Sequence, residues 1–239
     1  MTIPETENNR LILKEKKEEA NDVVTLKFCP KNGELPDFRA GQFVMVGLAN
    51  KELSGITKSY TISSAPGEKL LSITVKRKGS FSQALYDLKV GGEIKASEPQ
   101  GFFFPSENSQ DIVFLAGGIG ITPFYSIIKD TFKKNPDKKI HLFYSNKTLG
   151  DIAFLKDLDK LSAEYKNLRI IHLLTREQTR DPRVKEFKRL DADILKRHLG
   201  DLSRKDYFIC GSIGFVNDLW RELKKAGVKE EEIFTEAFF

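Results

Sequence analysis

The periodicity of the apolar residues changes once along the chain, within the polar stretch Pro105–Gln110. Before this stretch, short alternating runs are separated by turn residues, which is typical of small antiparallel sheets. After it, apolar strands alternate with amphipathic segments of helical spacing, which is typical of a parallel sheet covered on both faces. The sequence therefore predicts two domains, at residues 1–106 and 107–239.

The first domain is predicted to be an antiparallel β-barrel, because its strands recur at regular spacing with turns between them. One helix interrupts them: Ser82 is a favourable N-cap, and Ala84, Leu85 and Leu88 follow at helical spacing. The expected strands are Arg10–Lys17, Asp22–Phe28, Phe43–Leu48, Ile56–Ile62, Leu70–Lys76 and Gly92–Ala96.

The second domain is predicted to be an α/β parallel-sheet domain, because strands and helices alternate along it. The expected strands are Ile112–Ala116, Ile140–Tyr144, Leu168–Leu174, Tyr207–Cys210 and Ile233–Thr235. The expected helices are Ile121–Lys134, Ile152–Ala163, Ala192–His198 and Phe215–Ala226.

Composition excludes several classes of function. Of 239 residues, 40% are hydrophobic and 31% are charged, which predicts a soluble chain with a real core. No apolar run is long enough for a membrane span and no signal pattern is present, so we expect a cytoplasmic protein. We also expect a monomer. Two cysteines and three scattered histidines predict no metal site. The net charge of +5 is spread along the chain, which favours an acidic protein partner over nucleic acid.

Hydrogen-bonding groups are dense in the stretch Lys58–Pro66, which contains Lys58, Ser59, Tyr60, Thr61, Ser63 and Ser64. Tyr60 and Ile62 alternate with hydroxyl residues, as in a strand with one buried face. Such a strand end could hold a flat polar ring and its phosphates. On this stretch alone, a half-buried edge strand running into a turn is the simpler explanation.

Gly79-Ser80-Phe81-Ser82 opens the predicted helix of the first domain. The free N–H groups of Ser80, Phe81 and Ser82, together with the helix dipole, would form an anion site. The alternative is an ordinary helix cap.

Two glycine-containing turns follow predicted strands of the second domain. The first turn opens a helix and lies in the stretch Leu115-Ala116-Gly117-Gly118-Ile119-Gly120-Ile121-Thr122-Pro123-Phe124. The stretch Cys210-Gly211-Ser212-Ile213-Gly214-Phe215 has the same strand–turn–helix form. Neither is a G-x-G-x-x-G or a Walker loop. Glycines at a strand's carboxyl end favour close approach of a ligand, although a structural tight turn and an inert buried Cys210 are the alternatives.

These motifs, in this order and spacing, resemble those of the ferredoxin–NADP reductase family of flavoprotein reductases. The resemblance extends over nearly the whole chain, from Leu11 to Phe239. It implies a flavin-binding antiparallel barrel followed by a nicotinamide-nucleotide domain. It further implies FAD as the cofactor, with FMN left open because Lys58 replaces the family's usual arginine.

The resemblance assigns flavin contacts to the first domain. Tyr60 would contact the ribityl chain or phosphate, and Thr61 would hydrogen-bond near flavin N5. The remaining flavin contacts would come from Lys58, Ser59, Val75, Lys76, Arg77, Gly79, Ser80, Phe81 and Ser82.

The resemblance assigns the nicotinamide nucleotide to the second domain. Its pyrophosphate would be held by Gly117, Gly118, Gly120, Thr122 and Pro123, and its nicotinamide would border Cys210 and Gly211. Leu174-Thr175-Arg176-Glu177-Gln178 resembles the family's Ser-Arg-Glu-Gln, in which the hydroxyl and the guanidinium take the 2′-phosphate. This favours NADPH over NADH, although NADH-using relatives can also carry an arginine there. Thr61, Cys210 and Glu236 would surround the reacting centre. Phe238 or Phe239 would cover the flavin; the alternative for these two residues is an apolar, frayed C-terminus.

Three functions compete on this basis. The first is a reductase that passes electrons from NAD(P)H through FAD to an acidic carrier such as ferredoxin or flavodoxin. The second is a reductase of free flavin or ferric chelates. The third is a non-catalytic flavin-binding subunit of an electron-transfer complex, which the intact nucleotide loops argue against. Because the chain lacks the four cysteines of an iron–sulfur domain, any one-electron centre would belong to a separate partner.

Overall fold

A computed structural model describes residues 9–48, 53 and 55–238. The chain divides into two compact units. One unit runs up to Phe104 and includes Tyr125–Asp130, and the other contains Pro105–Phe124 and the chain from Thr131 onward. Each unit is described separately below.

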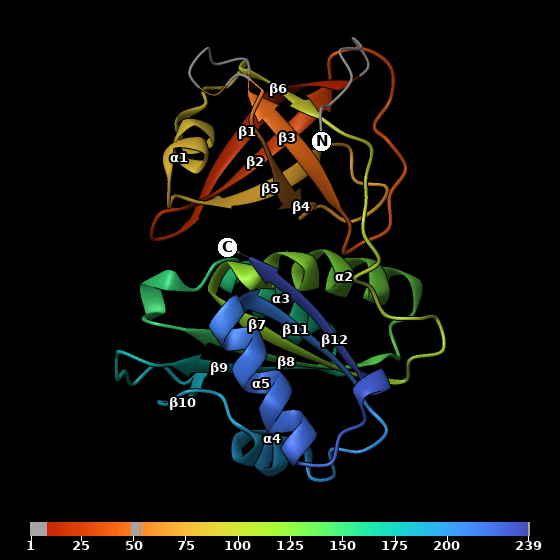
Figure 1. Cartoon of the computed structure of the whole chain (residues 1–239), viewed down its shortest axis with the longest axis vertical. Helices are drawn as coiled ribbons and strands as arrows, with labels where there is room; N and C mark the ends of the chain where they lie inside the picture. Colours follow the sequence, from red (N-terminus) through yellow and green to blue (C-terminus); the bar gives the residue numbers. More distant parts are fainter. Residues whose placement is uncertain (1–8, 49–52, 54, 239) are drawn as a thin grey trace. The chain divides into compact units, whose positions relative to one another are not determined.

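The first unit contains a six-stranded sheet in the order β4-β3-β6-β1-β2-β5, in which every pair of neighbours is antiparallel (Figure 1). A bridge between Ile62, just after β4, and Ile73 of β5 joins the two ends of this order, which closes the sheet into a barrel. The strands are β1 (Arg10–Ala20), β2 (Val23–Pro30), β3 (Phe43–Leu48), β4 (Thr57–Thr61), β5 (Leu71–Lys76) and β6 (Glu93–Ala96).

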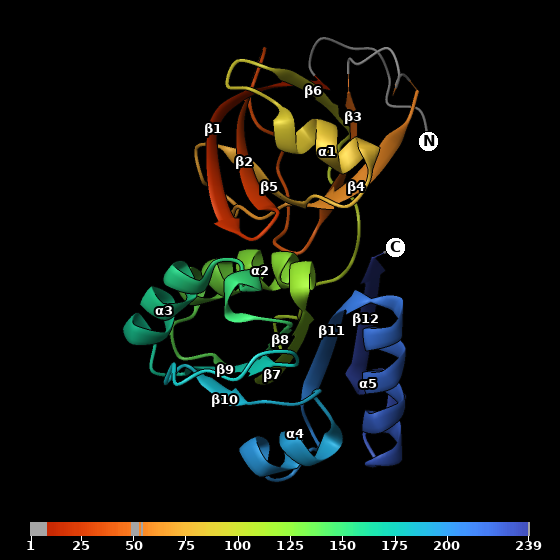
Figure 2. The same ribbon diagram turned by 90° about the vertical axis from the view of Figure 1, so that its left-hand side faces the viewer.

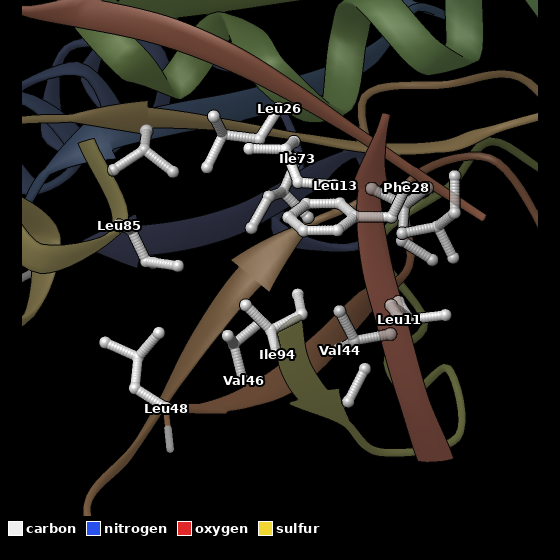
Figure 3. Packing of buried hydrophobic residues seen from close by; sticks show 14 of the residues in the cluster. Leu11, Leu13, Leu26, Phe28, Val44, Val46, Leu48, Ile73, Leu85 and Ile94 are labelled. Atoms are coloured by element: carbon white, nitrogen blue, oxygen red, sulfur yellow. The ribbon is translucent and has the colours of Figure 1, made fainter. Parts of the chain in front are cut away.

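The barrel interior is filled by apolar side chains that alternate inward along the strands. Leu11 and Leu13 of β1, two residues apart, both point into this core, and Leu26 and Phe28 of β2 repeat the pattern. Figure 3 shows Phe28 beside Leu13 and Ile73. Truncating so large a buried ring costs about 3–5 kcal/mol in proteins generally, so Phe28 is a strong determinant of this core.

The helix α1 (Ser80–Asp87) begins one residue after Gly79, its N-cap. The sequence-based assignment of Ser82 as N-cap is therefore wrong: Ser82 is the third helical residue. Its hydroxyl folds back on the entry turn, accepting from the Lys78 N–H at 2.9 Å and donating to the Gly79 carbonyl at 2.9 Å. Leu85 of the same helix is fully buried in the barrel core.

The second unit contains a six-stranded parallel sheet in the order β10-β9-β8-β7-β11-β12. The chain starts at the central strand, runs outward through β8, β9 and β10, and then returns to β11 on the other side of β7. The carboxyl ends of β7 and β11 are thus a topological switch point, where open α/β sheets bind ligands. The strands are β7 (Asp111–Gly117), β8 (Lys139–Asn146), β9 (Leu168–Leu174), β10 (Val184–Glu186), β11 (Asp206–Ser212) and β12 (Ile233–Phe238).

Helices cover both faces of this sheet (Figure 2). The helices α2 (Ile121–Lys134) and α3 (Leu155–Glu164) lie on one face, and Phe124 of α2 stacks on Phe114 of β7 at 4.5 Å between ring centroids. The helices α4 (Ala192–Leu199) and α5 (Ile213–Lys225) lie on the other face, where Leu195 and Leu219 pack against Val113. This two-sided burial explains why the strands are apolar throughout.

The structure departs from the sequence-based assignment in three elements of this unit. The edge strand β10 was not predicted, because three residues with one buried valine carry little signal. The strand β12 continues to Phe238. A short 3-10 helix, η4 (Leu149–Asp151), precedes α3, which starts only at Leu155 because Phe154 adopts a left-handed conformation with φ of 59°.

No helix among residues 9–48 and 55–238 is long and apolar enough to cross a membrane. In the same ranges, no group of three or more histidine, cysteine or carboxylate side chains is arranged to hold a metal ion.

Candidate active site

The glycine turns at the ends of β7 and β11 pack against each other so closely that side chains are excluded. A Cβ atom on Gly120 would lie 2.2 Å from the Cys210 carbonyl oxygen. A Cβ atom on Gly117 or Gly211 would lie 2.9 or 2.8 Å from the ring of Phe215. These three glycines are therefore required by the fold itself. Phe215, the last residue of the second glycine motif, is the side chain that fills the space between the two turns.

Gly118 and Gly214 differ from these glycines because they border open space. A Cβ atom on either would have no neighbour within 4 Å, and Gly118 has φ of +54°. The turn η3 (Gly118–Gly120) leads directly into α2. Thr122 is buried, and its hydroxyl donates to the Ile119 carbonyl at 2.8 Å, so it stabilises this turn. A ligand at this edge would therefore approach through the Gly118 side of the turn.

Cys210 and Glu236 are register partners on the parallel strands β11 and β12. Cys210 is fully buried, and burial, followed by the Glu236 charge, raises the pKa of its thiol well above the usual value. Burial also raises the pKa of Glu236 to about 7, and its Oε2 has no hydrogen-bond partner within the described part of the chain. Glu236 is thus a carboxyl group that can exchange a proton near neutral pH.

The aromatic tail is partly ordered as a strand. Phe238 is the last residue of β12 and pairs in register with Ser212 at the carboxyl edge of β11. Phe239 lies outside the described residues. The described part of the tail is therefore held in the sheet up to the same edge as Cys210 and Gly211.

The loop after β9 begins with polar and charged residues. The Thr175 hydroxyl donates to the Asn146 carbonyl at 3.2 Å. The exposed Arg176 and Arg180 have no ion-pair partner among the described residues. Arg183, in contrast, pairs with Asp159 at 2.8 Å and with Asp181, so its charge is already compensated.

Asn146, at the end of β8, was also missed by the sequence analysis. It is only 5% exposed, and neither its Oδ1 nor its Nδ2 has a partner in the described chain. His172, buried on the neighbouring strand, has an unpaired Nδ1, and desolvation lowers its pKa to about 4. A polar run directly after the apolar strand, Ser145-Asn146-Lys147-Thr148, is the signal that could have identified this edge.

In the first unit, most hydroxyls near β4 bond to one another. Ser63 is linked to Ser72 at 2.9 Å and to Thr74 at 3.0 Å, and Thr74 is linked to Thr25 at 2.9 Å. Ser64 accepts the Ser72 N–H at 3.0 Å. These buried hydroxyls form a ladder inside the barrel wall and are not available to a ligand.

Thr61, the last residue of β4, is the exception. It is 4% exposed, and its Oγ1 has no hydrogen-bond partner in the described chain. Burying an unpaired hydroxyl costs about 1–3 kcal/mol, so a bound group that supplies the missing partner would be favoured. Next to it, Tyr60 stacks on Phe81 of α1 with centroids 6.3 Å apart, and burial raises the pKa of the phenol to about 12.

The start of α1, whose Phe81 contacts Tyr60, presents unpaired donors. The N–H groups of Ser80, Phe81 and Ser82 have no acceptor within the described chain, while Gln83 already bonds to the Gly79 carbonyl. Gly79 itself has no neighbour within 4 Å of a Cβ position. Free donors at the positive end of a helix dipole suit a phosphate.

Cations near this helix start fall into two groups. Lys58, Lys76 and Lys78 have no ion-pair partner among the described residues, and two of them, Lys58 and Lys78, are exposed. Arg77 is paired with Asp22 and lies over the Tyr86 ring at 5.0 Å. Val75 is fully buried in the core, so it can face a ligand only through its backbone. An unpaired buried hydroxyl, an aromatic face, free helix donors and free lysines together fit a flavin and its phosphates.

Comparison with known proteins gives the same two-part division. Residues 10–104 match the oxidoreductase FAD-binding domain family, and residues 114–220 match the oxidoreductase NAD-binding domain family. The flavohemoprotein of Bacillus subtilis strain 168 is 28% identical over 235 residues, covering 95% of this chain and 58% of that protein. This chain thus spans somewhat more than half of the length of this relative.

Solved structures share the fold over almost the whole chain. The FAD/NAD-binding domain of nitric oxide dioxygenase from Vibrio cholerae superposes with a TM-score of 0.85 at 23% identity, covering 97% of this chain and 98% of that one. A ferredoxin NADP⁺ reductase from Neisseria gonorrhoeae with bound FAD and NADP gives 0.84 at 22% identity, covering 98% and 100%. The flavohemoglobin of Malassezia yamatoensis, with bound FAD and haem, gives 0.85 at 20% identity, covering 96% and 60%.

Proposed function

Because the chain belongs to the ferredoxin–NADP reductase family of FAD- and NAD-binding oxidoreductases, we propose that it transfers a hydride from NAD(P)H to FAD and passes electrons on to a ferredoxin- or flavodoxin-like protein. The observation that carries the proposal is that the first unit combines an unpaired, buried Oγ1 of Thr61 with free N–H groups at the start of α1. When bound, FAD supplies the chemistry that converts a two-electron donor into single-electron steps.

The first unit binds and orients the flavin in this proposal. Thr61 donates its hydroxyl hydrogen to the flavin ring, and Tyr60 packs its phenol against the ribityl chain. The phosphates lie at the start of α1, where the N–H groups of Ser80, Phe81 and Ser82 donate and Gly79 leaves room. The unpaired Lys58 and Lys76 supply positive charge, and Val75 and Arg77 contribute backbone at the end of β5.

The second unit binds the donor at the carboxyl edge of β7 and β11. The turn from Gly117 to Pro123 supports the pyrophosphate, with Gly118 as the open approach. Gly211 and Cys210 border the nicotinamide. Glu236, with a pKa near 7, holds a proton that it can deliver at neutral pH.

Arg176 favours NADPH as the donor, because its unpaired guanidinium can bind a 2′-phosphate by a bidentate contact. Thr175 was assigned to the same phosphate from the sequence. Its hydroxyl donates to the Asn146 carbonyl. In this proposal Thr175 therefore stabilises the loop and does not bind the phosphate.

A haem protein is the second candidate acceptor. The Malassezia flavohemoglobin carries FAD and haem in one chain, and this chain spans 60% of it. A reductase with the same fold could deliver electrons to a haem domain, whether on a separate protein or elsewhere in a longer polypeptide.

Anaerobic mixing of the purified protein with NADPH and, separately, NADH tests the proposal. We expect a yellow protein whose flavin absorbance bleaches faster with NADPH, followed by reoxidation on adding ferredoxin, flavodoxin or a haem protein. A colourless preparation that neither FAD nor FMN restores would refute flavin binding. Bleaching that is fast only with NADH would refute the donor preference and leave the reductase function standing.

A further inference from the structure

The loop that carries Arg176 is fastened to the end of β8 and to the loop after it by four hydrogen bonds. Two are between backbones: the Thr175 N–H donates to the Asn146 carbonyl at 3.0 Å, and the Arg176 N–H donates to the Lys147 carbonyl at 2.9 Å. They extend the pairing of β8 and β9 beyond the ends of both strands. The backbone of Arg176 is therefore fixed before any donor is bound.

The other two bonds involve side chains, and one of them is the bond from the Thr175 hydroxyl to the Asn146 carbonyl at 3.2 Å. The Glu177 Oε2 accepts the N–H of Leu149 at 2.7 Å. Leu149 is the first residue of η4, so its N–H has no partner inside that turn. The Thr148 N–H and hydroxyl donate to Asp151 at 3.0 and 2.7 Å, which completes the start of the same turn. Glu177 thus caps a turn that belongs to a different loop.

This bond also determines the electrostatics of Arg176. A glutamate next to an arginine in an exposed loop is a ready ion-pair partner for it. Here the Glu177 carboxylate is engaged with Leu149, and Arg176 has no ion pair among the described residues. The cap therefore keeps the guanidinium available for an external anion.

The far end of the loop is fastened separately. Arg183 bonds to Asp159 of α3 at 2.8 Å and to Asp181 at 2.8 Å through its Nε. Residues 175–183 are thus held at both ends, with Arg176 and Arg180 as the unpaired cations between them.

We propose that Glu177 is a positioning residue that holds Arg176 in place for the 2′-phosphate of the donor, an inference that rests on the proposed donor site. It acts through Leu149 and touches no part of the donor. Its effect requires a hydrogen-bond acceptor at this position and does not require a negative charge.

Three variants separate positioning from charge. Glu177→Ala removes the acceptor, Glu177→Gln keeps an amide oxygen in its place, and Glu231→Ala removes an exposed carboxylate with no described partner as a matched control. Binding of adenosine 2′,5′-bisphosphate, which has the 2′-phosphate and no nicotinamide, would be measured by calorimetry. Amide hydrogen exchange at Leu149 and Arg176 reports the loop directly.

We expect Glu177→Ala to weaken bisphosphate binding by about three- to tenfold, the range for loss of one charged hydrogen bond felt indirectly. It should also accelerate exchange at Leu149 and raise KM for NADPH with little change in kcat. Glu177→Gln should restore binding to within about twofold, and Glu231→Ala should match wild type.

Tighter bisphosphate binding in both Glu177 variants would show that the carboxylate acts by repulsion, and would overturn the proposal. So would unchanged binding and exchange in Glu177→Ala. If the wild type does not bind the bisphosphate, the donor preference fails, and exchange alone decides: accelerated exchange at Leu149 and Arg176 supports the positioning of the loop by Glu177, and unchanged exchange overturns it.

Discussion

Replacing Thr61 with valine should change the stability of the flavin-free protein and its affinity for FAD in opposite directions. Valine has nearly the shape of threonine, so the substitution removes the hydroxyl and leaves the packing of β4 intact. In the flavin-free protein that hydroxyl is buried and unpaired, whereas in the holoprotein we propose that it bonds to the flavin.

The size of each effect follows from these two states. Relief of one unpaired buried hydroxyl is worth about 1–3 kcal/mol. In a protein of this size each kcal/mol shifts Tm by about 2–4 °C, so flavin-free Thr61→Val should melt about 2–12 °C higher than wild type. Loss of one hydrogen bond to FAD is worth about 0.5–1.5 kcal/mol, which is a two- to tenfold increase in Kd.

The assay is thermal denaturation of deflavinated protein, followed by FAD titration monitored through quenching of flavin fluorescence. Thr25→Val is the matched control, because its hydroxyl lies in the same barrel and bonds to Thr74 at 2.9 Å. It should lower Tm and leave FAD affinity unchanged. If Thr61→Val lowers the stability of the flavin-free protein and binds FAD as wild type does, the assignment of Thr61 to the flavin is wrong.

Three further predictions concern the second unit. Arg176→Ala should lower kcat/KM for NADPH by about tenfold to a hundredfold, the value of one charge-assisted bond, and barely affect NADH; equal losses for both donors would contradict the phosphate assignment. Because the pKa of Glu236 is raised to about 7, the folded state favours its neutral form, so the free energy of unfolding should fall as pH rises from 4.5 to 7 and level off above. Glu236→Gln should abolish this dependence of Tm on pH, and an identical dependence in both proteins would refute the assignment. Gly120→Ala should lower the free energy of unfolding by several kcal/mol, because its Cβ would meet the Cys210 carbonyl at 2.2 Å. Gly118→Ala, in open space, should lower it by only about 1–2 kcal/mol. Thermal denaturation of both variants tests this, and the reverse order would refute the packing argument.

The architecture could be predicted from the sequence because the apolar periodicity is strong in both units. Strands buried on both faces, such as β7 and β8, read as continuous apolar runs, and Ile140–Tyr144 marks one of them well. The failures are local. Phe154 adopts a left-handed backbone within the predicted helix, and phenylalanine carries no sequence signal for that conformation. The strand β10, with three residues, is too short to show a pattern.

The candidate site was harder to predict, because sequence shows which groups are present and not which of them are already paired. Lys58–Pro66 contains four hydroxyls, yet in the structure Ser63 and Ser64 are used within the barrel wall and Thr61 is left unpaired. The pairing depends on Ser72 and Thr74, which lie on another strand and give no signal of their own.

The glycines show the same distinction between groups that the fold consumes and groups that it leaves open. Gly117, Gly120 and Gly211 are needed because backbone or Phe215 occupies the space where a side chain would be. Gly118 is needed for a different reason, since it has positive φ and faces open space. A ligand can use only what the fold has not used. The phosphates of the donor should therefore meet the second unit at Gly118 and Arg176, while Gly117, Gly120, Gly211 and Thr175 fix the positions of these two.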